Sequence, residues 1–225
     1  MKAMILAAGR GERMRPLTDV TPKPLLQVAG KALIEYHLEL LAKLGIENVI
    51  INHAWLGEKI PAKLGNGASY GVSIEYSDES TGALETAGGI IKALPLLGDE
   101  PFLVINGDIF LVAPNIKLPK LDEGKLAHLW LVENPSHNLK GDFYLDNGLI
   151  ENQSSSDAQS YTFSGVAIYR PAFFEQSPAE QKLALAPLLR LAADKQLLSG
   201  EVLTSEWTDV GTPQRLDSLN RQIKG

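Results

Sequence analysis

A run of small residues near the N-terminus is the part of the sequence best suited to approach phosphate. Ala7, Ala8, Gly9 and Gly11 directly follow a short apolar stretch at residues 4–6. Small residues let backbone N–H groups come close to a phosphate chain, and glycine permits the positive φ values that such a cradle needs. The pattern predicts a phosphate-binding loop at the end of a buried strand.

Basic side chains follow these glycines. Arg10, Arg13 and Arg15 belong to the same loop, and Lys23 follows in Thr-Pro-Lys-Pro-Leu. Cations near a triphosphate offset its charge and stabilise a leaving pyrophosphate. Two familiar glycine loops are excluded, because a dinucleotide fingerprint needs glycine where Met14 stands and a Walker A loop needs Gly-Lys-Ser/Thr. A strand-to-helix turn with solvated arginines is the alternative interpretation.

Two aspartates could bind a divalent cation. Asp108 follows Asn106-Gly107 at the end of an apolar run, and Asp209 lies in Trp-Thr-Asp-Val-Gly-Thr-Pro before a helical pattern. Carboxylates at the carboxyl ends of parallel strands lie where α/β sheets bind ligands. Mg²⁺ typically takes one or two carboxylates together with phosphate oxygens and waters. Each aspartate alone could equally be a turn or helix-cap residue.

Glu85 and Thr86 mark a second junction between a strand and a helix. Backbone groups at such a junction can read the edge of a base, and a helix N-terminus favours anionic neighbours. An acidic residue in the first turn also stabilises a helix by about 0.3–1 kcal/mol without any ligand. Both roles stay open for Glu85.

The elements that must position these residues follow from hydrophobic periodicity. In the first half, strands are expected at 4–6, 49–51, 72–76 and 102–105, and helices at 33–44, 58–64 and 86–97. Strands that alternate with helices favour right-handed βαβ units and a mostly parallel sheet, which is an α/β fold.

The second half is more mixed. Strands are expected at 126–132 and 166–169, a hairpin at 142–150, a polar loop at 152–160, and helices at 183–193 and 213–223. The sequence contains no internal repeat and no linker-like shift in composition. A single domain over residues 1–225 is the simplest organisation.

Composition excludes several classes of function. The net charge is −6 with both signs interspersed, which argues against a nucleic-acid-binding surface. The chain has no cysteine, so disulfides, thiolate catalysis and cysteine-bound zinc are excluded. No segment approaches the roughly 18 apolar residues of a membrane span, and no targeting segment is visible. We therefore expect a cytoplasmic protein.

The motifs at both ends of the chain resemble one family. Residues 6–31 combine Gly-x-Gly-x-Arg, Arg-Pro-Leu-Thr, Pro-Lys-Pro-Leu and Gly-Lys, and closely resemble the sugar-phosphate nucleotidyltransferases. Trp-x-Asp-x-Gly-Thr-Pro around Asp209 is similar to that family's second-metal motif. The resemblance runs from residue 1 to about 220 and is weakest at 117–160. It implies a three-layer, Rossmann-like nucleotidyltransferase fold with a mixed, mostly parallel central sheet.

The resemblance also implies residue roles. Arg13 would grip the triphosphate and Lys23 would bridge the reacting phosphates, while Asp108 and Asp209 would bind Mg²⁺. The other positions expected at the nucleotide are Ala7, Ala8, Gly9, Gly11, Glu12, Glu85, Thr86 and Asn106. The positions expected at the sugar are Gly141, Glu151 and Gly165. Residues up to about 115 would form a nucleotide-binding half, and residues 116–225 a sugar-binding half.

Four shorter motifs resemble a narrower group, the bacterial N-acetylmuramate 1-phosphate uridylyltransferases. They are Asn-His-Ala-Trp-Leu-Gly at 52–57, Leu-Glu-Thr at 84–86, Gly-Asp-Phe at 141–143 and Phe-Ser-Gly at 163–165. This likeness implies UTP and a muramic acid phosphate as substrates, in cell-wall recycling. A lactyl carboxylate needs a cation or N–H partner, for which Lys140, Lys182 and Arg190 are candidates, although each could be a solvated surface charge.

Two other functions remain alternatives. Asn152 and Gln153 depart from the family's usual Glu-Lys-Pro pattern, so another hexose 1-phosphate nucleotidyltransferase is possible, such as a mannose guanylyl- or a glucose thymidylyl- or uridylyltransferase. A non-catalytic nucleotide-sugar sensor would be expected to lack a charged site residue, whereas all four are present. For an enzyme, we expect small-molecule substrates and no nucleic acid, membrane or obligate protein partner.

Overall fold

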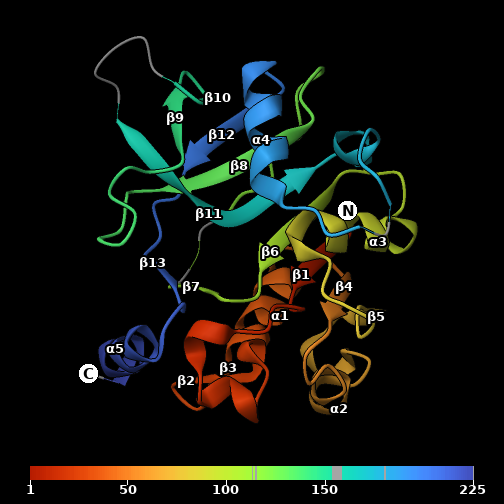
Figure 1. Ribbon diagram of the computed structural model, residues 1–225, viewed down its shortest axis with the longest axis vertical. Helices are drawn as coiled ribbons and strands as arrows, with labels where there is room; N and C mark the ends of the chain where they lie inside the picture. Colours follow the sequence, from red (N-terminus) through yellow and green to blue (C-terminus); the bar gives the residue numbers. More distant parts are fainter. Residues whose placement is uncertain (113, 115, 154–158, 180, 225) are drawn as a thin grey trace.

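A nine-stranded sheet runs through the whole molecule. The computed structural model describes residues 1–112, 114, 116–153, 159–179 and 181–224, so most of the polar loop expected at 152–160 lies outside the described residues. The strand order is β5-β4-β1-β6-β11-β8-β12-β10-β9. Figure 1 shows the red and orange elements of the first half below and the green and blue strands of the second half above.

The first half forms the parallel part of this sheet. Its strands are β1 (Ala3–Leu6), β4 (Asn48–His53), β5 (Ser73–Asp78) and β6 (Phe102–Asn106). Its helices are α1 (Leu33–Lys43), α2 (Lys59–Leu64) and α3 (Glu85–Leu97). Parallel neighbours need long crossover connections, which these helices supply. The βαβ prediction is confirmed here, with bounds within a few residues of those expected.

Helices cover both faces of the parallel part, because successive strand residues point to opposite sides. On β1, Ala3 and Ile5 join one hydrophobic cluster together with Leu38 of α1. Met4 lies between them and joins the opposite cluster together with Ile90 of α3. This double burial holds the carboxyl end of β1 in a fixed place, where the phosphate-binding loop begins.

The second half is largely antiparallel. β11 (Ser160–Tyr169) pairs antiparallel with β6 and with β8 (Ala127–Val132). β9 (Phe143–Asp146) and β10 (Leu149–Glu151) form the expected hairpin. Only β12 (Leu198–Val202) runs parallel to its neighbour β8, while it pairs antiparallel with β10.

The expectation of a mostly parallel sheet is therefore wrong for this half. Hairpin neighbours can follow each other directly, whereas a parallel pair needs a crossover of a dozen or more residues. The chain passes from β9 through β10 to β11 without a helix between them in the described residues, and antiparallel pairing results. The strand expected at 166–169 begins earlier, at Ser160, and β12 was not predicted.

Two short strand pairs lie outside the main sheet. β2 (Gln27–Val28) pairs with β3 (Lys31–Ala32), and β7 (Ile109–Leu111) pairs with β13 (Trp207–Asp209). The β7–β13 pair joins segments that are a hundred residues apart in the chain. Single-turn 3₁₀ helices occur at Glu12–Met14, Leu17–Asp19, Lys23–Leu25, Ala68–Tyr70 and Pro171–Phe174.

The two remaining helices confirm their sequence predictions. α4 (Leu185–Asp194) packs beside β10 and β12, and α5 (Pro213–Lys224) ends the described chain. Leu216 and Leu219 of α5 join Met14 and Val28 in a third hydrophobic cluster. Figure 1 accordingly shows α5 beside β2 and β3 of the N-terminal part. None of the described helices is both long enough and apolar enough to cross a bilayer.

Candidate active site

Most of the sequence-predicted site residues surround one cavity at the carboxyl ends of the parallel strands. The cavity has a volume of about 340 Å³. The loop after β1 contributes Ala7, Ala8, Gly9, Gly11, Glu12 and Arg13. Lys23, Glu85, Thr86, Asn106 and Asp108 complete the predicted set at this cavity. Open α/β sheets bind their ligands at this edge.

Gly11 holds the loop in a shape that other residues would not adopt easily. Its φ is +68°, and a Cβ atom there would lie 2.9 Å from Cγ2 of Thr18. Thr18 is fully buried and donates a hydrogen bond from Oγ1 to the carbonyl of Gly11 at 2.8 Å. Gly9, by contrast, has open space where a Cβ would point, and it lines the cavity.

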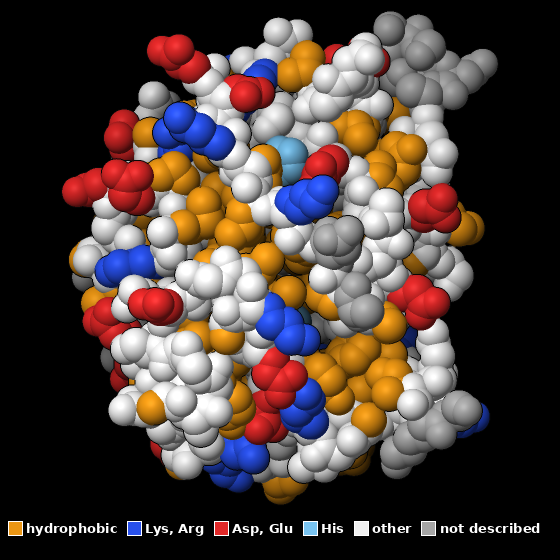
Figure 2. Space-filling view, turned by 180° about the vertical axis from the view of Figure 1, so that it is seen from behind, with side chains coloured by type: hydrophobic (Ala, Val, Ile, Leu, Met, Phe, Trp, Pro, Cys, Tyr) orange, Lys and Arg blue, Asp and Glu red, His pale blue; other side chains and the backbone are white. Residues whose placement is uncertain are grey.

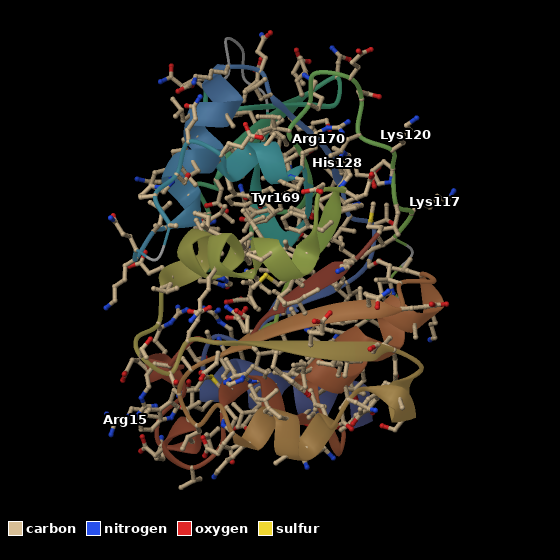
Figure 3. The ribbon with its side chains drawn as sticks, turned by 90° about the vertical axis from the view of Figure 1, so that its right-hand side faces the viewer. Arg15, Lys117, Lys120, His128, Tyr169 and Arg170 are labelled. Carbon is tan, nitrogen blue, oxygen red and sulfur yellow. The ribbon has the colours of Figure 1, made fainter. Side chains whose placement is uncertain are left out.

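Only one of the three loop arginines reaches the cavity. Arg13 lines it. The Arg10 guanidinium lies 3.7 Å from the centre of the Trp55 ring, and both Arg10 and Arg15 pair with Asp19. Figure 3 shows Arg15 at the margin of the molecule. Arg10 and Arg15 therefore hold the loop in place from outside, and Arg13 remains as the arginine available to a triphosphate.

Lys23 and Asp108 form an ion pair inside the cavity. The Lys23 ammonium lies 2.5 Å from Oδ2 of Asp108, and Lys23 is only 9 % exposed. Asp108 follows β6 in a tight turn, in which the N–H of Gly107 donates to the carbonyl of Leu6 at 2.9 Å. A Cβ at Gly107 would lie 2.6 Å from that carbonyl oxygen. Glycine is thus required for β6 to bring Asp108 against the end of β1.

Asp209 lies beside Asp108 through the β7–β13 pair. Asp209 is opposite Ile109 in the register, and the N–H of Val210 donates to the Asp108 carbonyl at 2.7 Å. A Cβ at Gly211, which lines the cavity, would be 2.8 Å from Oδ2 of Asp209 and 3.6 Å from Nη2 of Arg13. The backbones of the two predicted metal ligands are thus adjacent, with Asp108 in the lining of the cavity and Asp209 beside its wall at Gly211.

Basic groups surround the Asp209 carboxylate. Arg215 donates to its Oδ2, and Nε2 of His137 lies 3.1 Å from its Oδ1. Within the described residues, no group of three or more histidine, aspartate or glutamate side chains gathers into a metal cage. A divalent cation held here would take the two aspartates and complete its shell with phosphate oxygens and water, as Mg²⁺ commonly does.

A buried histidine packs behind this site. His37 of α1 is 2 % exposed and forms a hydrogen bond with the backbone of Ile109. Burial lowers the pKa of His37 to about 4, although the nearby Asp108 carboxylate acts to raise it. His37 is therefore neutral near pH 7 and adds no positive charge behind Asp108.

Sequence reasoning missed a buried amide–carboxylate pair that links two loops of the cavity. Asn52 accepts a hydrogen bond from the N–H of Ala7 at 2.7 Å and donates to Oε1 of Glu79 at 2.7 Å. Glu79 accepts a second hydrogen bond from the N–H of Leu84 at 3.0 Å. Both side chains line the cavity. The position of Asn52 in the sequence could have indicated this pair, because Asn52 is near the end of β4 and opposite Leu6, the last residue of β1.

Glu85 begins α3 with an unusual backbone conformation. Its φ is +61°, a region that residues other than glycine enter at a cost. Glu85, Thr86 and Asn106 line both this cavity and a second one of about 450 Å³. The two cavities are therefore neighbours with a shared wall.

The residues that line the second cavity differ from those expected at the sugar. Asp142 and Phe143 of the β9 segment line it, together with Arg190 of α4. Gly141 lies next to Asp142 and has a φ of +65°. A Cβ atom there would lie 2.9 Å from the carbonyl oxygen of Tyr161, so Gly141 is a turn residue that other residues would not replace easily. Glu151 lies on β10 opposite Tyr144. Neither Gly141 nor Glu151 is among the residues that line this cavity.

Gly165 sits at a bulge in β11, where the pairing with β8 shifts between Phe163 and Val166. A Cβ at Gly165 would lie 2.6 Å from Nδ2 of Asn106. Asn106 lines both cavities, and Gly165 packs against Asn106. Gly165 thus borders the wall that the two cavities share.

Comparisons with known proteins agree with this geometry. Residues 2–224 match the family described as nucleotidyl transferase. The chain is 54 % identical to an N-acetylmuramate alpha-1-phosphate uridylyltransferase of Neisseria meningitidis serogroup B, over 96 % of this chain and 95 % of the relative. It is 34 % identical to a protein of the same name from Caulobacter vibrioides, over 94 % and 92 % of the two chains.

The fold has a counterpart among solved structures. A Bacillus anthracis protein described as a glucose-1-phosphate thymidylyltransferase superposes with a TM-score of 0.82 at 23 % identity, covering 100 % of this chain and 95 % of that one. At this identity the likeness concerns the fold alone. The family match over almost the entire chain and the site at the carboxyl ends of β1 and β6 lead to one conclusion: this protein is a member of the nucleotidyl transferase family.

Proposed function

We propose that this protein transfers the uridylyl group of UTP to N-acetylmuramate α-1-phosphate, which gives UDP-N-acetylmuramate and pyrophosphate in cell-wall recycling. The relatives that match it over nearly their whole length bear the name of this activity. The ion pair of Lys23 and Asp108 inside the cavity, beside the glycine loop, is the observation on which the proposal depends most.

In the proposed reaction, an oxygen of the sugar phosphate attacks the α-phosphorus of UTP in line with the bond to the β-phosphate. A new P–O bond forms at the α-phosphorus, the old bond breaks, and the electron pair leaves with pyrophosphate. A phosphate monoester, whose second pKa is about 6, is already largely dianionic at pH 7, so no general base is needed. The protein must instead hold two anions in contact by positioning and fixed positive charge.

Lys23 and Arg13 would supply that charge. Lys23 lies between the glycine loop and Asp108, where its ammonium would contact both the α-phosphate and the incoming sugar phosphate. Arg13, near Gly211 at the cavity wall, would hold the β- and γ-phosphates. Arg10 and Arg15 are engaged with Asp19 and would not share this role.

Asp108 and Asp209 would hold Mg²⁺. Their adjacency across β7 and β13 supports this assignment, as does the small number of protein ligands that Mg²⁺ usually takes. When bound, the ion neutralises and orients the α-phosphate. Lys23 and Arg215 pair with the two carboxylates, so two cations lie next to the place where phosphate oxygens would bind.

The cavity walls suggest where the two substrates lie. Glu85 and Thr86 at the start of α3 face the loop after β1, so the uracil would lie between these segments. The sugar would lie in the second cavity, between β9 and α4. This arrangement supports a nucleotide-binding half up to about residue 115 and a sugar-binding half after it. Helices on both faces of β1 support the three-layer arrangement that the resemblance implies.

A substrate grid tests the proposal. Pyrophosphate release by the purified protein with Mg²⁺ is measured for UTP, GTP and dTTP, each with N-acetylmuramate, N-acetylglucosamine, glucose and mannose 1-phosphates. We expect the highest kcat/KM for UTP with N-acetylmuramate 1-phosphate. A preference for GTP with mannose 1-phosphate, or for dTTP with glucose 1-phosphate, would replace this proposal by the alternative enzyme.

The same grid separates an enzyme from a sensor. A nucleotide-sugar sensor would bind UDP-N-acetylmuramate, measured by calorimetry, but would release no pyrophosphate from any pair. We expect turnover, and we expect it to disappear when Mg²⁺ is removed with a chelator and to return when Mg²⁺ is added again. The proposal further includes a cytoplasmic enzyme that acts on small molecules without an obligate protein partner.

A further inference from the structure

The second cavity has one basic side chain among its described lining residues. Arg190 of α4 lines this cavity, whereas Lys140 and Lys182, the other cations considered from the sequence, do not. Another part of its lining is the wall shared with the first cavity, formed by Glu85, Thr86 and Asn106. A sugar whose 1-phosphate reached Lys23 would therefore extend from that wall toward Arg190.

The described contacts of Arg190 hold its guanidinium at one nitrogen. Nη1 donates to the carbonyl of Asp142 at 3.2 Å and to Oδ1 of Asn152 at 3.3 Å. The guanidinium carbon lies 5.3 Å from the centre of the Phe143 ring. Both hydrogen bonds from Arg190 to the described residues use Nη1, so among these residues the edge formed by Nε and Nη2 is open to a carboxylate in the two-point geometry that arginine favours.

The carboxylate of Asp142, which lines the same cavity, does not compete for this edge. Oδ1 of Asp142 accepts a hydrogen bond from Nδ2 of Asn138 at 3.2 Å, and its Oδ2 accepts one from the N–H of Phe163 at 2.9 Å. Asp142 therefore reaches Arg190 through its backbone carbonyl and keeps its side chain bound elsewhere. Glu85, the other acidic residue of the lining, belongs to the shared wall.

Apolar side chains flank the guanidinium. Phe143, Leu185 and Leu189 line the same cavity, and Leu189 and Phe143 are buried in the hydrophobic cluster beneath it. Such a wall suits the methyl groups of a lactyl ether or an acetamido group. Among the described residues, the lining thus combines an apolar surface with a single cation, which fits a sugar that carries a carboxylate on a short branched substituent.

We propose that Arg190 is the specificity-determining residue for the sugar, and that its guanidinium binds the carboxylate of an acidic sugar 1-phosphate. This inference rests on the proposed uridylyl transfer and names the group that selects its acceptor. Arg190 acts on binding of the acceptor and takes no part in the reaction at phosphorus.

The test compares two acceptors that differ only in the lactyl group. KM and kcat are measured with UTP and either N-acetylmuramate or N-acetylglucosamine 1-phosphate, for the wild type, Arg190→Gln and Arg190→Lys. We expect Arg190→Gln to raise KM for the muramate at least about tenfold, as the loss of a hydrogen bond between charged groups would. KM for N-acetylglucosamine 1-phosphate should change less than about twofold, and Arg190→Lys should restore part of the preference.

Lys182→Gln is the matched control, because Lys182 is an exposed cation that precedes α4 and does not line the cavity. It should change neither KM. An equal loss with both acceptors in Arg190→Gln would overturn the inference, since it would mean that Arg190 only holds β9 against α4. An unchanged KM for the muramate would overturn it as well.

Failure of the proposed function gives a different result. If no sugar phosphate releases pyrophosphate from UTP, binding of N-acetylmuramate 1-phosphate to the wild type and to Arg190→Gln is measured by calorimetry. Tighter binding to the wild type, without the same difference for N-acetylglucosamine 1-phosphate, would still support the role of Arg190. Equal binding would reject it.

Discussion

Lys23 is nearly buried, and its ammonium group lies against Asp108 at the edge of the phosphate cavity. A fixed positive charge in a site sheltered from water stabilises developing negative charge far more than a solvated one does. Arg13 lines the same cavity. At the scale of single residues, the candidate site therefore draws Arg13, Lys23, Asp108 and the nearby Asp209 from four separate segments.

Lys23→Gln should lower kcat about 10²–10³-fold, which is the usual effect of losing one preorganised group that stabilises the transition state. The variant and wild type are compared by pyrophosphate release at saturating Mg²⁺, with thermal unfolding as a check on folding. Lys120→Gln is the control, because Lys120 is exposed and Figure 3 shows it on the surface. The size of such effects varies between proteins by roughly threefold. A kcat of the variant within about threefold of the wild-type value would therefore contradict the role of Lys23.

Asp209→Asn should raise the Mg²⁺ concentration needed for half-maximal activity about tenfold or more, because a charged ligand is lost while the shape of the site is kept. Activity is titrated with MgCl₂ for the variant and for Asp217→Asn, which removes an exposed carboxylate from α5. If the two variants require the same Mg²⁺ concentration, Asp209 is not a metal ligand.

At the scale of elements, the loops around the cavity must keep their relative positions. Asn52 and Glu79 connect the loop after β1 to the loop before α3 through buried hydrogen bonds. Gly89 of α3 lies against both side chains, since a Cβ there would be 2.7 Å from Oε1 of Glu79 and 2.8 Å from Nδ2 of Asn52. These two loops are therefore joined within the protein.

Two glycines of one loop should respond differently to alanine. Gly11→Ala should lower the free energy of unfolding by about 1–2 kcal/mol, because alanine disfavours a φ of +68° and its Cβ would press on Thr18. Gly9→Ala should leave stability nearly unchanged but raise KM for UTP, since its methyl group would enter the cavity. Urea unfolding and steady-state kinetics measure the two effects, and equal destabilisation by both substitutions would refute this account of the loop.

At the scale of the whole molecule, one continuous sheet carries both cavities, and α5 returns the end of the chain to the N-terminal part. Figure 2 shows lysine, arginine, aspartate and glutamate side chains interspersed over the face in view. Charges of both signs therefore share that face, and neither sign dominates it.

Stability should fall as the pH drops below about 6.5. His128 on β8 is buried, and burial lowers its pKa, while Glu201 and Asp122 act to raise it. The folded state thus binds a proton less readily than the unfolded state, so stability is full above the unfolded pKa of about 6.5 and is lost as pH falls toward the folded value. His37, with a pKa lowered to about 4, acts in the same direction.

Urea unfolding of the wild type and of His128→Asn at pH 7.5 and pH 5.5 measures this effect. The wild type should lose more stability between the two pH values than the variant does. At pH 7.5 and above, both histidines are neutral in both states, so the curves there provide the reference. Equal losses in the two proteins would show that His128 does not contribute to the acid sensitivity.

The sequence by itself determined the first half of the fold and most of the residues that line the first cavity. Strands and helices there have clear periodicities, and alternation of the two dictates parallel pairing, which places every loop after a strand at one edge. Gly11 and Asp108 follow such strands closely in the chain, so local pattern was enough to predict their meeting, whereas Lys23 was expected there from the resemblance to a family.

The tertiary structure decided what depends on contacts between distant segments. Periodicity indicates that a strand exists but not which neighbour it pairs with, so the antiparallel pairing of β11 with β6 and β8 was not foreseen. β12 was not predicted as a strand at all. Periodicity also cannot state where a long side chain turns, and only the fold sends Arg13 into the cavity and Arg10 onto Trp55. For the same reason Arg190, from a helix far along the chain, came to line the second cavity only once α4 had packed beside β10.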